Sequence, residues 1–173
     1  GGERDGGIDG EITQIDTTAL PIHRAAEVHG FHPKDFMPTR LALDLEPYQQ
    51  YAYAAAEQAL AQSGLHGSTR VGIVMATALH GLTIITKTQT RIDVRGQSAE
   101  PKLLTKCMGN LAACQFSIMH QITGPSLTVS TACSSGGDAI TMGTMLLRSG
   151  MADAVVVMAG EAAICPAFLQ SLD

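Results

Sequence analysis

Three short apolar runs, separated by helical segments, constrain the fold of this chain more than any other feature. The runs cover residues 71–76 (VGIVMA), 127–131 (LTVST) and 154–159 (AVVVMA). Runs of this length without charged residues are typical of strands buried on both faces of a parallel sheet. Because strand, helix and strand in this order form a right-handed crossover unit, we predict an α/β fold, mainly a parallel sheet with flanking helices.

Helical spacing of apolar residues places the helices between and before these strands. One helix is predicted from Pro47, a residue suited to a first helical turn, to a stop at Gly64. Others are expected over residues 82–91, 109–121 and 134–149, with a polar loop between the first two and Gly150 ending the last. Residues 1–40 are rich in Gly, Pro, His and charge, so we expect mostly loop there, with at most one short strand near residues 25–28. We therefore divide the chain into a loop-rich segment, 1–40, and an α/β unit, 41–173. The second unit ends soon after a strand, so we expect it to be half of a larger domain.

Composition excludes several classes of partner. The net charge is −5 and the 11 Lys and Arg do not cluster, so no nucleic-acid partner is expected. No apolar run approaches the ~18 residues that span a bilayer, and the first residues do not form an apolar signal segment, so we expect a cytoplasmic protein without a membrane partner. The cysteines form no CxxC pair, which favours free thiols over disulfides or zinc, and no metal or cofactor is expected. They are Cys107, Cys114, Cys133 and Cys165.

The segment at residues 130–137 (STACSSGG) lies between a predicted strand and a predicted helix and places Cys133 in the turn itself. The macrodipole and the unpaired N–H groups at a helix N-terminus stabilise a thiolate. The small neighbours of Cys133 allow a sharp turn and close approach of a substrate, as at a nucleophile elbow. From chemistry alone a small buried cysteine remains the alternative. Cys107 and Cys114 lie seven residues apart and, if both are helical, share one helix face, where core packing is expected; Cys165 carries no motif.

Residues 131–136 (TACSSG) resemble the active-site motif of the elongating β-ketoacyl-acyl carrier protein synthases, members of the thiolase-like superfamily. Other segments are similar to that family in order and spacing, so the resemblance covers nearly all of the chain after residue 10. They are residues 30–38 (GFHPKDFMP), 54–60 (AAAEQAL), 124–126 (GPS) and 152–154 (ADA) ahead of Gly160 and Glu161.

This resemblance implies a thiolase-like α-β-α-β-α sandwich of five layers built from two similar halves, of which the chain supplies the first. It also implies acyl transfer from the phosphopantetheine of an acyl carrier protein to Cys133, followed by decarboxylative condensation with a malonyl thioester. The backbone N–H of Cys133 would form one arm of an oxyanion hole. The implied partners are an acyl carrier protein and a second copy of the chain in a homodimer.

The same resemblance implies an acyl tunnel. Leu79 falls at the position that limits tunnel depth, Ala132 lies beside the nucleophile, and Leu172 occupies a wall position. Leu103 and Leu104 match a segment that reaches across a homodimer interface into the tunnel of the neighbour. Ordinary core packing is the alternative for each leucine.

Several departures from the family pattern keep other functions open. This sequence has no counterpart of the two family histidines that promote decarboxylation, of a lysine or of the second oxyanion loop. None of its histidines falls at a matching position, and those in the N-terminal loop are expected to be solvated. His80 replaces a residue that is usually glycine, and Met158 and Ala159 replace two glycines before Glu161.

The alternative functions are a thiolase that transfers acyl groups to coenzyme A, a catalytically silent partner subunit, and a fragment that only associates with its missing half. Acyl length and the choice between fatty acid and polyketide synthesis stay open. The histidines are His23, His29, His32, His66, His80 and His120.

Overall fold

The computed structural model describes residues 10–65 and 70–172, so His66, the first nine residues of the predicted loop segment and Asp173 lie outside it. The described chain forms two compact units, which we treat separately. The larger unit runs from Pro33 to Ala162, and the smaller combines residues up to His32 with residues from Ala163 onward. Across the described residues, none of the helices has the length and apolar character needed to cross a membrane.

A parallel sheet forms the centre of the larger unit. Its strands are β3 (Val71–Ala76), β4 (Ser126–Val129) and β5 (Ala154–Ala159), in the order β4-β3-β5. Ala76 at the end of β3 is level with Val129 of β4 and with Ala159 of β5, so the three strands end at one edge of the sheet. The predicted α/β fold with a parallel sheet is confirmed.

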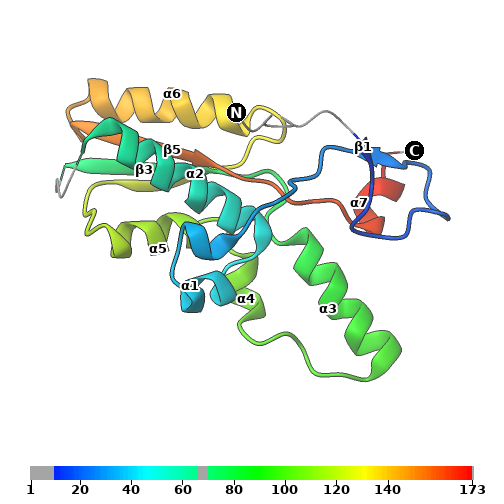
Figure 1. Ribbon diagram of the computed structural model, residues 1–173. Coiled ribbons are helices and arrows are strands. Elements are labelled where there is room, and N and C mark those ends of the chain that lie inside the picture. Colours follow the sequence, from blue (N-terminus) through cyan, green and yellow to red (C-terminus); the bar gives the residue numbers. More distant parts are fainter. Residues whose placement is uncertain (1–9, 66–69, 173) are drawn as a thin grey trace. The chain divides into compact units, whose positions relative to one another are not determined.

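Helices cover both faces of this sheet. Figure 1 shows α6 on one face and α2 and α5 on the other, which agrees with the two hydrophobic clusters that separate these faces. The helical elements of the larger unit are η1 (Pro33–Asp35), α1 (Thr39–Asp44), α2 (Pro47–Ser63), α3 (Leu82–Arg95), α4 (Leu103–Cys107), α5 (Leu111–Met119) and α6 (Ser135–Arg148).

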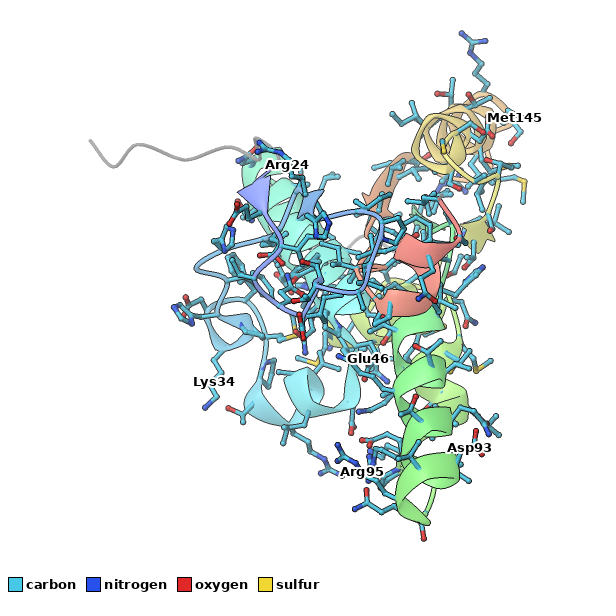
Figure 2. All side chains as sticks on the ribbon, turned by 90° about the vertical axis from the view of Figure 1, so that its right-hand side faces the viewer. Arg24, Lys34, Glu46, Asp93, Arg95 and Met145 are labelled. Atoms are coloured by element: carbon cyan, nitrogen blue, oxygen red, sulfur yellow. The ribbon has the colours of Figure 1, made fainter. Side chains whose placement is uncertain are left out.

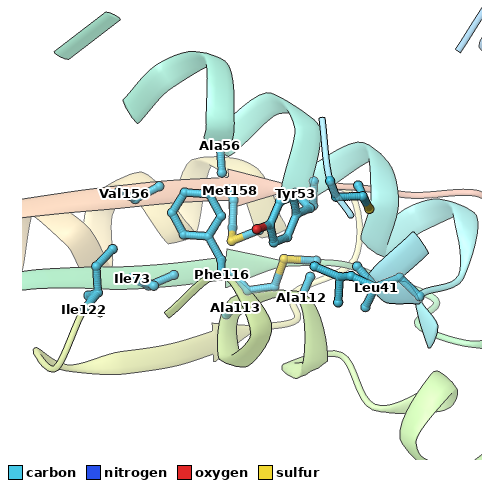
Figure 3. Close-up of a cluster of buried hydrophobic side chains, with 14 of the residues drawn as sticks. Leu41, Tyr53, Ala56, Ile73, Ala112, Ala113, Phe116, Ile122, Val156 and Met158 are labelled. Atoms are coloured by element: carbon cyan, nitrogen blue, oxygen red, sulfur yellow. The ribbon is translucent and has the colours of Figure 1, made fainter. Parts of the chain in front are cut away.

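The core of the larger unit follows from the central place of β3. All six of its residues are buried, and their side chains alternate between the two faces. Ile73 and Met75 join the cluster beneath α2 and α5, whereas Val74 and Ala76 join the cluster beneath α6. In the first cluster, the rings of Tyr53 and Phe116 meet edge to face with centroids 5.2 Å apart (Figure 3).

The ends of α2 are those that the sequence predicts. Pro47 occupies the first turn, and Glu46 and Gln49 form a reciprocal capping box in which each side chain accepts a backbone N–H. Gly64 ends the helix in the left-handed conformation, with φ of 68°. Gly150 likewise follows α6 with φ of 70°.

Three expectations about the larger unit are wrong. The strand in residues 127–131 is not buried on both faces. Ser126, Leu127 and Thr128 are exposed because the helices of the described chain pack mainly on β3 and β5 and cover β4 less. Cys107 and Cys114 do not share one helix face, because α4 ends at Cys107 and a separate helix, α5, follows. The loop predicted as polar contains α4, and the preceding helix extends four residues further, to Arg95.

The smaller unit joins the two ends of the chain. In it β1 (Gly10–Glu11) pairs antiparallel with β2 (Arg24–Ala25), so residues 24–25 are extended near the predicted strand, whereas β1 was not expected. Helix α7 (Pro166–Gln170) contributes Leu169 to a small hydrophobic core with Ile12 and Leu20.

Candidate active site

Cys133 lies in the turn that joins β4 to α6, between the last strand residue, Val129, and the helix N-cap, Ser134. Its side chain is exposed. Because parallel neighbours end at one edge of the sheet, this turn shares that edge with the segments that follow β3 and β5. Ligands of open parallel α/β sheets bind at such an edge, beyond the carboxyl ends of the strands.

The backbone before the cysteine is held in an unusual conformation. Ala132 has φ of 54°, in the left-handed region that L-residues with a Cβ rarely adopt. Ser135 stabilises it from the first turn of α6, because its hydroxyl donates to the Ala132 carbonyl at 2.6 Å and accepts the Thr131 N–H at 2.9 Å. Ser135 is itself buried, so these bonds are shielded from water. The turn therefore presents Cys133 to the outside on a fixed backbone.

Asp138 ties the same turn to α6 through its carboxylate. Oδ2 accepts hydrogen bonds from the hydroxyls of Thr131 and Ser134, the latter at 3.0 Å. The hydrogen bond from Thr131, followed by that from Ser134, lowers the pKa of Asp138 below its ordinary value. The motif around Cys133 thus includes a carboxylate that organises the turn, a role for which the sequence carries no signal beyond helical spacing.

Leu79 follows β3 at the same edge of the sheet and is half-buried. The carboxylate of Glu161, which follows β5, accepts the backbone N–H groups of Ala78 at 2.8 Å and Leu79 at 2.9 Å. His80 comes next with φ of 48°. A left-handed backbone at this position favours glycine, which explains in physical terms why histidine is a departure there.

Leu103 and Leu104 lie on the short helix α4, where Leu103 is half-buried and the Leu104 side chain is 82% exposed. Helix α4 is held to α2 by Tyr48, whose hydroxyl lies 3.2 Å from the carbonyl oxygens of both Lys106 and Met108. Burial raises the pKa of Tyr48, so the phenol stays protonated and donates.

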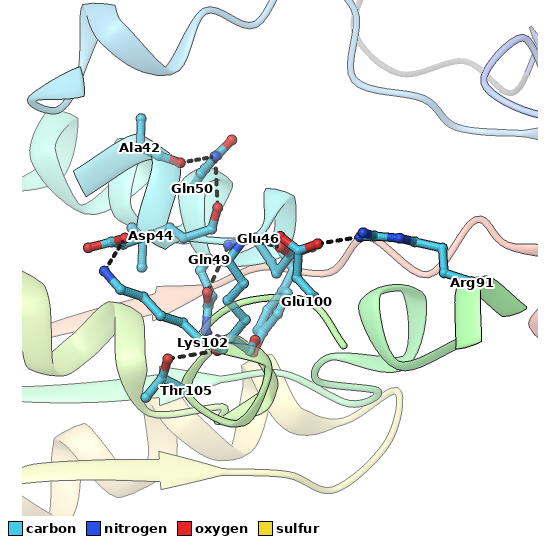
Figure 4. A network of polar contacts seen from close by, with 12 residues as sticks. Ala42, Asp44, Glu46, Gln49, Gln50, Arg91, Glu100, Lys102 and Thr105 are labelled. Atoms are coloured by element: carbon cyan, nitrogen blue, oxygen red, sulfur yellow. Dashed lines mark hydrogen bonds and ion pairs between the residues drawn. The ribbon is translucent and has the colours of Figure 1, made fainter. Parts of the chain in front are cut away.

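Ion pairs also hold this region together (Figure 4). Lys106 lies between two carboxylates, with its Nζ 3.3 Å from Glu46 Oε1 and 3.5 Å from Glu100 Oε1. Lys102 Nζ contacts Asp44 Oδ1 at 2.6 Å. These contacts join α4 to the end of α1 and to the start of α2, so Leu104 is exposed on an anchored helix.

The remaining predicted residues are placed as follows. Ala132 adjoins Cys133 in the turn, and Leu172, in the smaller unit, has a side chain that is 53% exposed. Cys165 is buried at the start of α7, whereas Cys107 and Cys114 are partly buried. In the part of the chain that the structure describes, no three His, Cys, Asp or Glu side chains gather closely enough to hold a metal ion.

Comparisons with known proteins identify the family. Residues 17–173 match the family model "Beta-ketoacyl synthase, N-terminal domain". The 3-oxoacyl-[acyl-carrier-protein] synthase 2 of Vibrio cholerae serotype O1 is 31% identical over 160 residues, which are 90% of this chain and 39% of that protein.

Solved structures show the same fold at lower identity. The ishigamide ketosynthase/chain length factor superposes with a TM-score of 0.82 at 24% identity, covering 92% of this chain and 41% of that one. A type II PKS acyl carrier protein in complex with its ketosynthase gives a TM-score of 0.72 at 21% identity, covering 85% and 43%. The chain spans about two fifths of the length of these proteins. Through its family-model match, its fold and its cysteine turn, the chain belongs to the β-ketoacyl synthase N-terminal domain family.

Proposed function

We propose that this chain supplies the nucleophile of a β-ketoacyl synthase and that Cys133 carries the acyl group as a thioester. The observation that carries the proposal is the exposed thiol of Cys133 in a fixed turn at the N-terminus of α6. The small neighbours of Cys133 leave its sulfur open to the approach of a thioester.

The proposed reaction has two steps. In the first, the Cys133 thiolate attacks the carbonyl carbon of an acyl group on a carrier protein, with the backbone N–H of Cys133 as one donor to the oxyanion. The bond from carbonyl carbon to phosphopantetheine sulfur then breaks, and that sulfur takes up a proton. In the second, a malonyl thioester loses CO₂, and its carbanion attacks the acyl-Cys133 carbonyl and releases the cysteine thiolate. No residue here matches the histidines of the second step, so we assign that step to a C-terminal half.

The test is acylation of the intact protein by an acyl carrier protein substrate, followed by intact mass. Cys133→Ala should abolish the adduct, and Cys133→Ser should weaken it severely because a hydroxyl is far less ionised than a thiol. An adduct on another cysteine, or normal condensation by the alanine variant, would contradict the proposal. An adduct formed only from acyl-coenzyme A would favour a thiolase instead.

Alkylation offers a second test on the 173-residue chain itself. Iodoacetamide should modify Cys133 before Cys107 and Cys114, which are partly buried, and long before the buried Cys165. The same chain should not extend an acyl group with malonyl thioester. Peptide mapping of the alkylated protein gives the order, and first modification of Cys165 would contradict the site.

We also propose a homodimer that forms along β4. Among the described strands β4 has β3 as its only neighbour, and Ser126, Leu127 and Thr128 are exposed on it. An unpaired edge strand is a template for pairing with a second chain. A stable interface of this kind buries more than ~2,000 Å², and a monodisperse monomer of the intact protein at micromolar concentration would contradict it.

The outer side of α6 supports the proposed two-half architecture. Ile140 is 61% exposed and Met145, labelled in Figure 2, is 57% exposed, although both are apolar. In a five-layered sandwich, a second half would cover this side. We expect the α6 amides to exchange more slowly in the intact two-half protein than in the 173-residue chain, and equal rates would argue against the architecture.

A further inference from the structure

Glu161 makes an unusual set of contacts at the edge of the sheet where Cys133 lies. Its Oε2 accepts two consecutive backbone N–H groups, of Ala78 at 2.8 Å and of Leu79 at 2.9 Å, and lies 3.4 Å from the hydroxyl of Thr77. Hydrogen bonds to an ionised acceptor are shorter and stronger than those between neutral groups. One side chain after β5 therefore holds the backbone of the turn after β3, 82 residues earlier in the chain.

This turn has a second anchor at its other end. A Cβ built on Gly109 would lie 2.3 Å from His80 Nδ1, so the imidazole packs directly against the Gly109 backbone. A Cβ on Gly81 would lie 2.6 Å from the Cα of Cys107. The far end of the turn is thus fixed by packing, whereas its near end, Ala78 and Leu79, is fixed by the Glu161 carboxylate.

The Glu161 side chain is exposed, so water replaces its hydrogen bonds when it is removed. Loss of the carboxylate should therefore have a small effect on folding and a larger effect on the order of the turn. The affected residue is Leu79, whose backbone N–H is one of the two that Glu161 holds.

We infer that Glu161 is a positioning residue for acyl-length selection: its carboxylate holds the Leu79 backbone so that the leucine side chain closes the acyl tunnel at one depth. The inference rests on the proposed function, because it takes Leu79 as the residue that limits the tunnel. Glu161 acts through Leu79 and does not itself contact the reacting atoms. Without the carboxylate, the near end of the turn is free to move, and longer acyl groups gain access.

The experiment uses the intact protein and a series of acyl carrier protein substrates from acetyl to long chains. The readout is the ratio of long to short acyl adducts on Cys133 after equal times, by intact mass. Glu161→Ala should raise this ratio at least fivefold. Glu161→Gln keeps an oxygen that accepts both N–H groups and should stay within twofold of the unaltered protein. Asp93→Asn, which removes an exposed carboxylate on α3 that contacts Gln89, is the matched control and should leave the ratio unchanged.

A double variant separates positioning from a general structural effect. If Glu161 acts through Leu79, adding Glu161→Ala to Leu79→Ala should not raise the ratio further, because the limiting side chain is already gone. Should Glu161→Ala fail to fold, Glu161→Asp, one methylene shorter, should raise the ratio in the same direction. An unchanged ratio in these variants, a glutamine variant equal to the alanine variant, or full additivity in the double variant would overturn the inference. Absence of any adduct on Cys133 in the unaltered protein would instead overturn the proposed function.

Discussion

Replacing Gly160 by alanine tests the packing that places Glu161 at the site. A Cβ on Gly160 would lie 2.1 Å from the carbonyl oxygen of Tyr48 and 3.0 Å from the Cβ of Ala52, both on α2. Contacts below 3.0 Å are essentially never made by real Cβ atoms, so the end of β5 and α2 must move apart by about 1 Å. Overpacking of this kind costs about 1–3 kcal/mol, and the upper value applies because the clash is with helix backbone.

The expected loss of about 3 kcal/mol corresponds to a fall of about 1.5 M in the urea midpoint, at a slope of about 2 kcal/mol/M. Gly137→Ala is the matched control, because a Cβ there meets no atom within 4 Å and alanine suits a helix better by about 0.5 kcal/mol. Both variants change the unfolded chain in the same way, because each replaces glycine by alanine. The difference between their free energies of unfolding therefore reports the clash of the new Cβ at position 160 with α2. Urea unfolding of the 173-residue chain, in which the space around Gly137 is open, measures both variants by circular dichroism. A Gly160→Ala midpoint equal to that of the unaltered chain would refute the packing argument.

Three further predictions concern the pocket, the interface and the turn. Leu79→Phe should block acylation of Cys133 by long acyl groups while sparing acetyl, and an unchanged long-to-short adduct ratio would remove the tunnel assignment. Leu127→Asp places a charge on the exposed edge strand β4 and should convert the proposed dimer to monomer in light scattering, and an unaltered mass would count against that interface. The folded pKa of Asp138 is lower than its value of 3.8 without these contacts, so its contribution to stability is present above about pH 4 and is lost as the pH falls through the folded pKa. Urea unfolding should therefore show Asp138→Asn less stable than the unaltered protein at pH 6, with the difference shrinking below pH 4, and a difference that grows on acidification would contradict the assigned hydrogen bonds.

The local sequence pattern was sufficient to predict the elements whose conformation depends on residues close together in the chain. The six apolar residues of β3 and the six of β5 predict strands with the observed bounds, and Pro47 and Gly64 mark the ends of α2. The position of Cys133, in a turn between a strand and a helix, also follows from the order of neighbouring residues alone. Each of these features depends on contacts or propensities within a few residues along the chain.

Other features depend on the order of strands in the sheet, which periodicity does not contain. Leu127 lies in an apolar run like the others, yet it is exposed because β4 is an outer strand that the helices cover less than β3 and β5. The contact of Glu161 with the backbone of Leu79 joins residues 82 positions apart, and it exists because β5 and β3 are neighbours whose carboxyl ends meet. The sequence by itself therefore determined which residue is the candidate nucleophile and which segments are strands, because these depend on local chemistry. Only the tertiary structure decided which carboxylate holds the turn that contains Leu79, because that pairing is set by which strands lie side by side.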